Sequence, residues 1–121
     1  MPSSTRAKRR SADDRLDLVF HALSDRTRRA LLGRLAQGPA MVSELAEPFD
    51  MSRIAVSKHV RVLERARLVA RAVDGRVHRC SLVAKPLQDV EQWLDHYRAF
   101  WGDTLDLLAH YVERDETDER H

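Results

Sequence analysis

The sequence has a single cysteine, Cys80, among its 121 residues. One cysteine cannot form a disulfide within the chain, and it cannot supply the several thiolates of a cysteine metal cage. The sequence also lacks an apolar run long enough for a membrane-spanning helix, and its polar, basic beginning lacks the apolar centre of a signal peptide. We therefore expect a protein that has no membrane partner and stays in the cytoplasm.

Sequence signatures of enzymes are missing as well. There is no glycine-rich phosphate loop and no nucleophile motif, and the carboxylates are scattered over charged helical faces without forming a catalytic arrangement. The sequence therefore predicts that the protein is not an enzyme and has no cofactor.

Charge is distributed unevenly along the chain, although the net charge is only +2. Residues 1–84 contain 17 Lys and Arg against 9 Asp and Glu, a net charge of +8. Residues 85–121 contain 4 against 10, a net charge of −6. Attraction for a polyanion is thus concentrated in the first two thirds of the chain, which favours nucleic acid as the partner.

The centre of the chain, residues 43–66, is predicted to form a short helix, a tight turn and a longer helix. Ser52 is a good N-cap for the longer helix, because its hydroxyl can accept a hydrogen bond from an unpaired amide. Val56, Val60 and Leu63 form one buried line on that helix. The opposite face combines cations, a hydroxyl and an isoleucine, which suit phosphates, base edges and thymine methyl groups. The predicted DNA contacts are Ser52, Arg53, Ile54, Ser57, Lys58, His59 and Arg61.

A hairpin is predicted directly after this helix. Two β-prone runs, 68–73 and 76–82, are separated by Asp74-Gly75, whose residues tolerate the positive φ values of a tight turn. A helix-turn-helix followed by a basic hairpin is a winged arrangement, in which the hairpin reaches the DNA backbone or minor groove. The combination is more specific than the helix alone, which would equally suit an ordinary amphipathic helix. The wing candidates are Arg76 and His78, with Arg71 and Arg79 nearby.

Two residues in these elements have alternative roles. His59 lies beside the buried line, so the alternative to a phosphate contact is a packed histidine with partners inside the protein. Cys80 is predicted to be a small apolar filler in a core-facing strand. The alternative for Cys80 is a redox sensor whose pKa is lowered by Arg79 and His78.

The first third of the chain is predicted to contain a basic flexible tail, residues 1–13, which has little to bury. A winged helix-turn-helix domain follows over residues 14–113, mainly α with a small β-hairpin. It begins with a helix over residues 14–23, and residues 40–42 are expected to form a short strand beside the wing.

A second helix is predicted to begin after Ser24 or Asp25 and to end near Gly38-Pro39. Arg28 and Arg29 lie in its first turns, where cations oppose the helix dipole. We therefore expect them to pair with an anionic group, either a neighbouring carboxylate, which we prefer, or a phosphate.

A long amphipathic helix is predicted over residues 86–113, followed by a frayed acidic tail over residues 114–121. Such a helix would be roughly 40 Å long, too long for so small a domain to cover. The economical solution is a twofold dimer that pairs the N-terminal and C-terminal helices of two copies. The predicted interface residues are Leu16, Val19, Phe20, Leu87, Val90, Leu94, Tyr97, Trp101 and Leu108.

Several short runs, in order along the chain, resemble the ArsR family of bacterial winged-helix repressors. They are LSDRTRRALL at 23–32, SELA at 43–46, Ser52 with AVSKHVRVL at 55–63, and Gly75-Arg76 in the hairpin. The resemblance covers residues 16–82 and, more loosely, the C-terminal helix. It implies a homodimer that binds a short operator palindrome in double-stranded DNA and represses transcription, often releasing DNA when an effector binds.

Many proteins of that family sense metals, but the residues here argue against a metal site. The family's thiolate site lies in the stretch 43–49, which contains no cysteine. At the family's second site, His110 and Glu113 match one half, whereas adjacent Asp95 and His96 diverge on a helix and Ala99 stands where a histidine is needed. We therefore expect no metal.

A protein-interaction module that kept the fold and binds a partner through its C-terminal helix is the alternative function. The spacing of residues does not identify the operator, the target genes or a small-molecule effector, and it does not separate a repressor from an activator.

Overall fold

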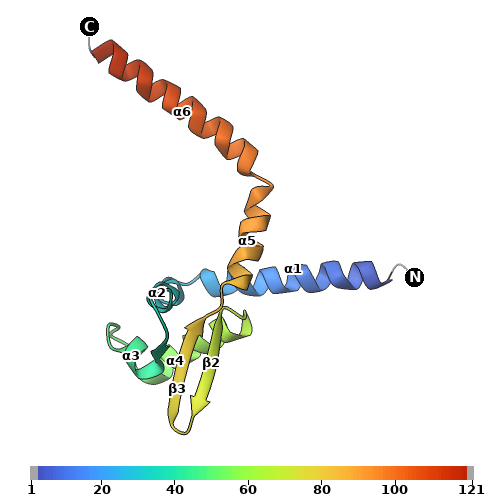
Figure 1. The fold of residues 1–121 in the computed structure, drawn as a ribbon, viewed down its shortest axis with the longest axis vertical. Coiled ribbons are helices and arrows are strands. Elements are labelled where there is room, and N and C mark those ends of the chain that lie inside the picture. Colours follow the sequence, from blue (N-terminus) through green and yellow to red (C-terminus); the bar gives the residue numbers. More distant parts are fainter. Residues whose placement is uncertain (1–2, 120–121) are drawn as a thin grey trace. The chain divides into compact units, whose positions relative to one another are not determined.

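The structure is a computed structural model that describes residues 3–119 (Figure 1). The predictions made for residues 1, 2, 120 and 121 lie outside the described part. Contacts divide the chain into two compact units, with the boundary after Asp89. In chain order the elements are α1 (Ser3–Leu23), α2 (Arg26–Leu35), β1 (Ala40–Met41), α3 (Val42–Ala46), α4 (Arg53–Arg65), β2 (Val69–Asp74), β3 (Val77–Leu82), α5 (Lys85–Asp95) and α6 (Arg98–Glu119).

The three strands form one antiparallel sheet in the order β1-β3-β2. Ala40 lies opposite Cys80, which confirms the predicted short strand beside the wing. The hairpin turn is Gly75-Arg76, because Asp74 pairs with Val77, so the turn lies one residue later than predicted. Gly75 has a φ of 62°. A positive φ at only the first central residue is the pattern of a type II′ turn, whose twist matches that of the strands.

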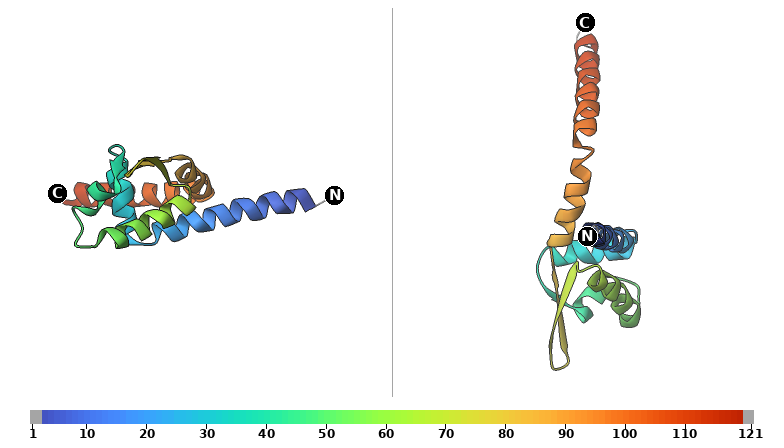
Figure 2. Two further views of the ribbon diagram at one scale, coloured as in Figure 1. Left: turned by 90° about the horizontal axis from the view of Figure 1, so that it is seen from below. Right: turned by 90° about the vertical axis from the view of Figure 1, so that its right-hand side faces the viewer.

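The core of the first unit lies around α4, which packs against α1, α2, α3 and β2 (Figure 2). Val56, Val60 and Leu63 are each 0% exposed, so the predicted buried line on α4 is confirmed. Their partners come from every neighbouring element. The other core residues include Val19, Ala22, Leu31, Leu32, Leu35, Leu45, Leu68, Val69 and Cys80.

Helix α2 begins at a side-chain cap. A carboxylate oxygen of Asp25 accepts a hydrogen bond from the amide of Arg28 at 3.0 Å, so Asp25 is the N-cap rather than Ser24. This hydrogen bond is the main reason that the pKa of the Asp25 carboxyl lies below its ordinary value, with smaller contributions from the charges of His59 and Arg28 and an opposing contribution from burial.

The two arginines in the first turns of α2 donate hydrogen bonds to carbonyl oxygens. The expected carboxylate is Asp25, which interacts with Arg28 through charge. Arg28 is 9% exposed, and it donates from Nε to the carbonyl of Ala22 at 2.8 Å and from Nη2 to that of His21 at 3.0 Å. Arg29 donates to the carbonyl of Leu23 at 2.8 Å. These carbonyls end α1, where they lack helical partners and carry the negative end of the dipole. The arginines therefore join α2 to α1.

The N-terminal segment is helical, which corrects the predicted tail. Helix α1 begins at Ser3, so residues 3–13 continue the helix that we expected to start at residue 14. Arginine, lysine and alanine are good helix formers and dominate this stretch. The guanidinium of Arg15 donates to the hydroxyl of Ser11 at 2.8 Å, one turn earlier.

The predicted single helix over residues 86–113 is wrong, because it is interrupted at His96 and Tyr97. The amide of Tyr97 bonds to the carbonyl of Leu94 at 2.9 Å, and that of His96 to the carbonyl of Trp93 at 3.3 Å. These i→i+3 bonds replace the i→i+4 pattern and end α5. Helix α6 then runs to Glu119, beyond the predicted end at residue 113. None of the described helices combines the length and apolar character needed to cross a bilayer.

Replacing Asp25 with alanine should lower the free energy of unfolding by about 1 kcal/mol at neutral pH, because α2 loses its cap. The folded-state pKa of Asp25 is lowered, so its ionised form stabilises the protein above the ordinary aspartate pKa. This contribution disappears as pH falls through the lowered pKa. The difference between Asp25→Ala and wild type in urea unfolding should therefore shrink on acidification. Asp25→Asn, which caps without titrating, is the control. If the free energy of unfolding of Asp25→Ala differed from that of wild type by the same amount at every pH, Asp25 would not act as an ionised cap.

Candidate nucleic-acid interface

Helix α4 begins at the predicted cap. The hydroxyl of Ser52 accepts a hydrogen bond from the amide of Ala55 at 3.1 Å, which confirms Ser52 as the N-cap. Because the buried line fixes the rotation of the helix, its opposite face points to solvent. Ile54 is 72% exposed, which is unusual for a large apolar side chain and leaves its methyl groups free for contact. Along the same face Arg53, Lys58 and Arg61 are exposed, and Ser57 is half-buried.

Helix α3 supports the start of α4. A carboxylate oxygen of Glu44 accepts from the amide of Met41 at 3.2 Å, which satisfies an unpaired donor where α3 begins. Leu45 and Ala46 are buried, and α3 packs against α4. The two helices and the turn between them form the predicted helix-turn-helix.

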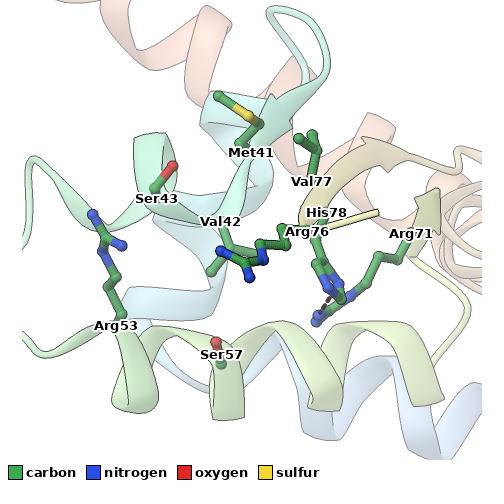
Figure 3. A pocket seen from close by; sticks show the side chains of 9 residues that line it. All are labelled: Met41, Val42, Ser43, Arg53, Ser57, Arg71, Arg76, Val77 and His78. Atoms are coloured by element: carbon green, nitrogen blue, oxygen red, sulfur yellow. Dashed lines mark hydrogen bonds between the residues drawn. The ribbon is translucent and has the colours of Figure 1, made fainter. Parts of the chain in front are cut away.

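A groove of about 410 Å³ lies between α4 and the hairpin (Figure 3). It brings together four of the predicted contact residues: Arg53 and Ser57 from α4, and Arg76 and His78 from the hairpin. The groove contains three arginines and no carboxylate among its lining residues, so it attracts anions. The lining is Met41, Val42, Ser43, Arg53, Ser57, Arg71, Arg76, Val77 and His78.

The hairpin is joined to α4 by an ion pair that the sequence analysis missed. The guanidinium of Arg71 contacts Oε1 of Glu64 through Nη2 at 2.6 Å and through Nε at 3.1 Å. Glu64 is the only carboxylate on α4, and this isolation on a basic helix was the available signal. The pair fixes the base of the wing relative to α4.

The same arginine orients His78 in the groove. Nη1 of Arg71 lies 3.3 Å from Nδ1 of His78, as drawn in Figure 3. A guanidinium can only donate, so Nδ1 accepts and the proton of the neutral ring lies on Nε2. Nε2 is then available as a hydrogen-bond donor to a ligand in the groove.

His59 faces α2 and not the groove. Its Nδ1 lies 3.3 Å from Nη1 of Arg28 and 3.8 Å from Oδ2 of Asp25. The structure therefore places His59 in its alternative role, as a packed histidine that links α4 to α2. Its predicted contact with DNA has no support from this geometry.

Cys80 is fully buried in β3, and burial raises the pKa of its thiol. A thiol held in its protonated form is a poor nucleophile, which agrees with the predicted filler role. Among the residues that the structure describes, histidine, cysteine, aspartate and glutamate side chains do not come together in groups of three or more that could hold a metal ion. His110 lies on the exposed surface of α6.

The predicted dimer residues fall into three groups by exposure. Val19 is 2% exposed and belongs to the core of its own chain, because that face of α1 packs against α2 and α4, so its assignment to an interface is corrected. Leu16, Leu87, Val90 and Leu94 are half-buried. Phe20, Tyr97, Trp101 and Leu108 are exposed. Seven further large apolar residues of α1, α5 and α6, which were not predicted to lie in the interface, are also exposed: Leu18, Trp93, Phe100, Leu105, Leu107, Tyr111 and Val112.

Replacing Glu64 with alanine should loosen the hairpin, because Arg71 loses its carboxylate. The side chains of Arg71 and Glu64 are 19% and 32% exposed, so we expect a loss of up to about 1 kcal/mol. Hydrogen exchange of the β2 and β3 amides measures it. Glu47→Ala, which removes an exposed carboxylate beside α3, is the matched control. Equal protection of the hairpin in both variants would show that the ion pair does not hold it.

Known proteins similar to this chain are transcriptional regulators. Residues 23–72 match a family described as a helix-turn-helix domain. The HTH-type transcriptional regulator Rv2034 of Mycobacterium tuberculosis is 38% identical over 102 residues, which cover 84% of this chain and 92% of that protein. The transcriptional repressor SdpR of Bacillus subtilis is 34% identical over 76 residues, which cover 63% of this chain and 84% of that repressor.

A solved structure has the same fold. The crystal structure of the ArsR family transcriptional regulator RHA00566 has 43% sequence identity and a TM-score of 0.70, and the match covers 74% of this chain and 93% of that one. The fold and the relatives are those of transcriptional regulators rather than enzymes. This chain therefore belongs to the ArsR family of winged helix-turn-helix proteins, and it is a DNA-binding transcriptional regulator.

Proposed function

We propose that the chain acts as a homodimeric repressor that occupies an operator palindrome in double-stranded DNA. The observation that carries this proposal is the groove between α4 and the hairpin, which three arginines line without a carboxylate. One of the similar proteins, SdpR, is named a transcriptional repressor. The similar regulators come from bacteria, where a protein that binds DNA acts in the cytoplasm.

The exposed face of α4 and the groove beside it have distinct roles in reading DNA. Arg53 and Ser57 lie near the start of α4 and supply donors for base edges, while exposed Ile54 suits a thymine methyl group. Lys58 and Arg61 bind phosphates. At the hairpin Arg76 also binds phosphate, and Nε2 of His78 donates to the backbone or to a base.

Dimerisation explains the exposed apolar side chains of the second unit. Phe100, Leu105, Tyr111 and Val112 are between 57% and 68% exposed along α6. A contiguous apolar surface of this kind marks a site of protein contact. A second copy is the economical partner, because a twofold axis places two α4 helices about 34 Å apart, one turn of DNA. A separate partner protein would also cover this surface, but it would leave the arginine-lined groove without a function.

In vitro selection of bound DNA tests the proposal, and wild type should select a palindrome whose half-sites lie one turn apart. Lys58→Ala and Arg76→Ala should weaken binding to all sequences and reduce the salt dependence by about one counterion per contact. Arg53→Ala and Ser57→Ala should change the selected sequence, with about 1–3 kcal/mol lost at one base position for the arginine. Arg114→Ala, which removes a cation from α6, is the control. Equal losses of one kind at all four positions would contradict this division of roles.

Equilibrium sedimentation tests the dimer. Wild type should have the mass of two chains at micromolar concentration. Leu105→Glu should shift the mass to one chain, because it buries an unpaired carboxylate in an apolar interface. His110→Glu places the same charge on an exposed position of α6 on the polar side of the helix, which also carries Asp106 and Glu113, and should stay dimeric. A monomer mass for wild type would refute the homodimer.

A further inference from the structure

A second cavity, of about 580 Å³, lies where the end of α4 meets α1 and the start of α5. This volume is within the range of small-molecule sites in proteins. The cavity is separate from the groove, and the two share no lining residue. All of its lining residues precede Val90, so it belongs entirely to the first unit.

The cavity combines an apolar floor with a cationic rim. Leu18, Val19, Ala66, Val83 and Pro86 supply the apolar part. The charged side chains are four cations and one carboxylate: Arg15, Arg65, Arg67, Lys85 and Asp89.

The cations at the end of α4 are available to a ligand. Asp89 is already engaged by Lys85 at 2.8 Å, and Arg15 contacts the hydroxyl of Ser11. Within the described part of the chain, no hydrogen bond or ion pair involves the guanidinium of Arg65 or Arg67. Both side chains are exposed beside the buried Ala66, so two guanidinium groups border an apolar surface.

Arg67 occupies a backbone position that normally favours glycine. Its φ is 61°, and it is the only described non-glycine residue with a positive φ. The amide of Arg67 bonds to the carbonyl of Glu64 at 2.9 Å, and that of Leu68 to the carbonyl of Leu63 at 3.0 Å. These two bonds form the Schellman motif that ends α4, and Arg67 is at the position where glycine is usual. A side chain kept at a strained position at the edge of a cavity indicates a use for that side chain.

We propose that this cavity binds an amphipathic organic anion, a carboxylate or phosphate attached to an apolar chain. The anionic group pairs with the guanidinium groups of Arg65 and Arg67, which can bind it bidentately. The apolar chain covers Leu18 and the floor of the cavity. Because Arg65 ends α4 and Arg67 caps it, a bound anion restrains the helix whose other end carries Arg53.

Coupling to DNA would pass through the position of α4. Its 13 residues span about 20 Å, which exceeds the screening length of about 8 Å at physiological salt, so the anion's charge is not felt directly at Arg53. The proposal that the anion binds depends only on the cavity. The proposed effect of the anion on DNA binding also depends on the proposed function.

Isothermal titration calorimetry of the full chain tests the site with octanoate and octyl phosphate. Acetate, inorganic phosphate and octanol are controls that carry only one half of the ligand. Both amphipathic anions should bind, and the tighter of the two identifies the anionic group. Binding by neither, or equal binding by octanol, would overturn the proposal.

Arg67→Gly separates binding from stability. The variant relieves the positive φ, so its Tm should equal or exceed that of wild type, while its affinity for the amphipathic anion should fall about tenfold, as expected for one charge-assisted hydrogen bond. Arg65→Gln should show a similar loss without changing the backbone. Arg26→Ala, which removes an exposed cation from α2, should bind as wild type does. Unchanged affinity in both cavity variants would overturn the assignment.

DNA binding measured with and without a saturating anion tests the coupling. The affinity of wild type for its selected DNA should change about fivefold or more, and that of Arg67→Gly should not. If Arg67→Gly weakens DNA binding without any anion as much as Lys58→Ala does, the cations are phosphate contacts and the proposal is wrong. If wild type binds no DNA, the proposed function fails, and calorimetry still decides the site.

Discussion

The arrangement of the first unit depends on the burial of one line of side chains on α4. Val56, Val60 and Leu63 are completely buried, and each such side chain contributes about 1.5–3 kcal/mol of apolar transfer free energy. That burial leaves the helix only one rotation about its axis. The exposure of Arg53, Ile54 and Lys58 follows from it, because these residues lie on the remaining face.

Two polar clusters refine the position of this helix. His59 meets Arg28 and Asp25 on the side of α2, and Glu64 meets Arg71 at the base of the hairpin. Arg28 in turn binds the last carbonyls of α1. Helices α1, α2 and α4 and the wing are thus held by hydrogen bonds as well as by apolar packing. Such directional contacts add to the apolar packing by fixing how α2 and the wing are oriented relative to α4.

Local patterns in the sequence predicted much of the fold. The caps at Asp25 and Ser52, the buried line on α4 and the hairpin all depend on residues within a few positions of one another. The features that were not predicted depend on residues farther apart in the sequence. Arg28 donates to a carbonyl of the preceding helix, and His59 contacts Arg28, which lies 31 positions earlier. The interruption at His96 and Tyr97 was also missed, because neither residue is a helix breaker like glycine or proline. Within the groove, four predicted residues lie together, whereas Arg71 was recognised only as part of a basic hairpin.

The tight hairpin restricts how the wing can vary among related chains. β2 and β3 pair along their full length, from Val69 opposite Leu82 to Asp74 opposite Val77, and only Gly75 and Arg76 remain for the turn. Side chains alternate between the faces of a strand, so losing or gaining one residue in β3 would move His78 to the face away from α4. Wing length can therefore change only in steps of two residues per strand, about 7 Å each, if the groove is to keep its lining. A longer or shorter wing therefore evolves by insertions or deletions of two residues in each strand.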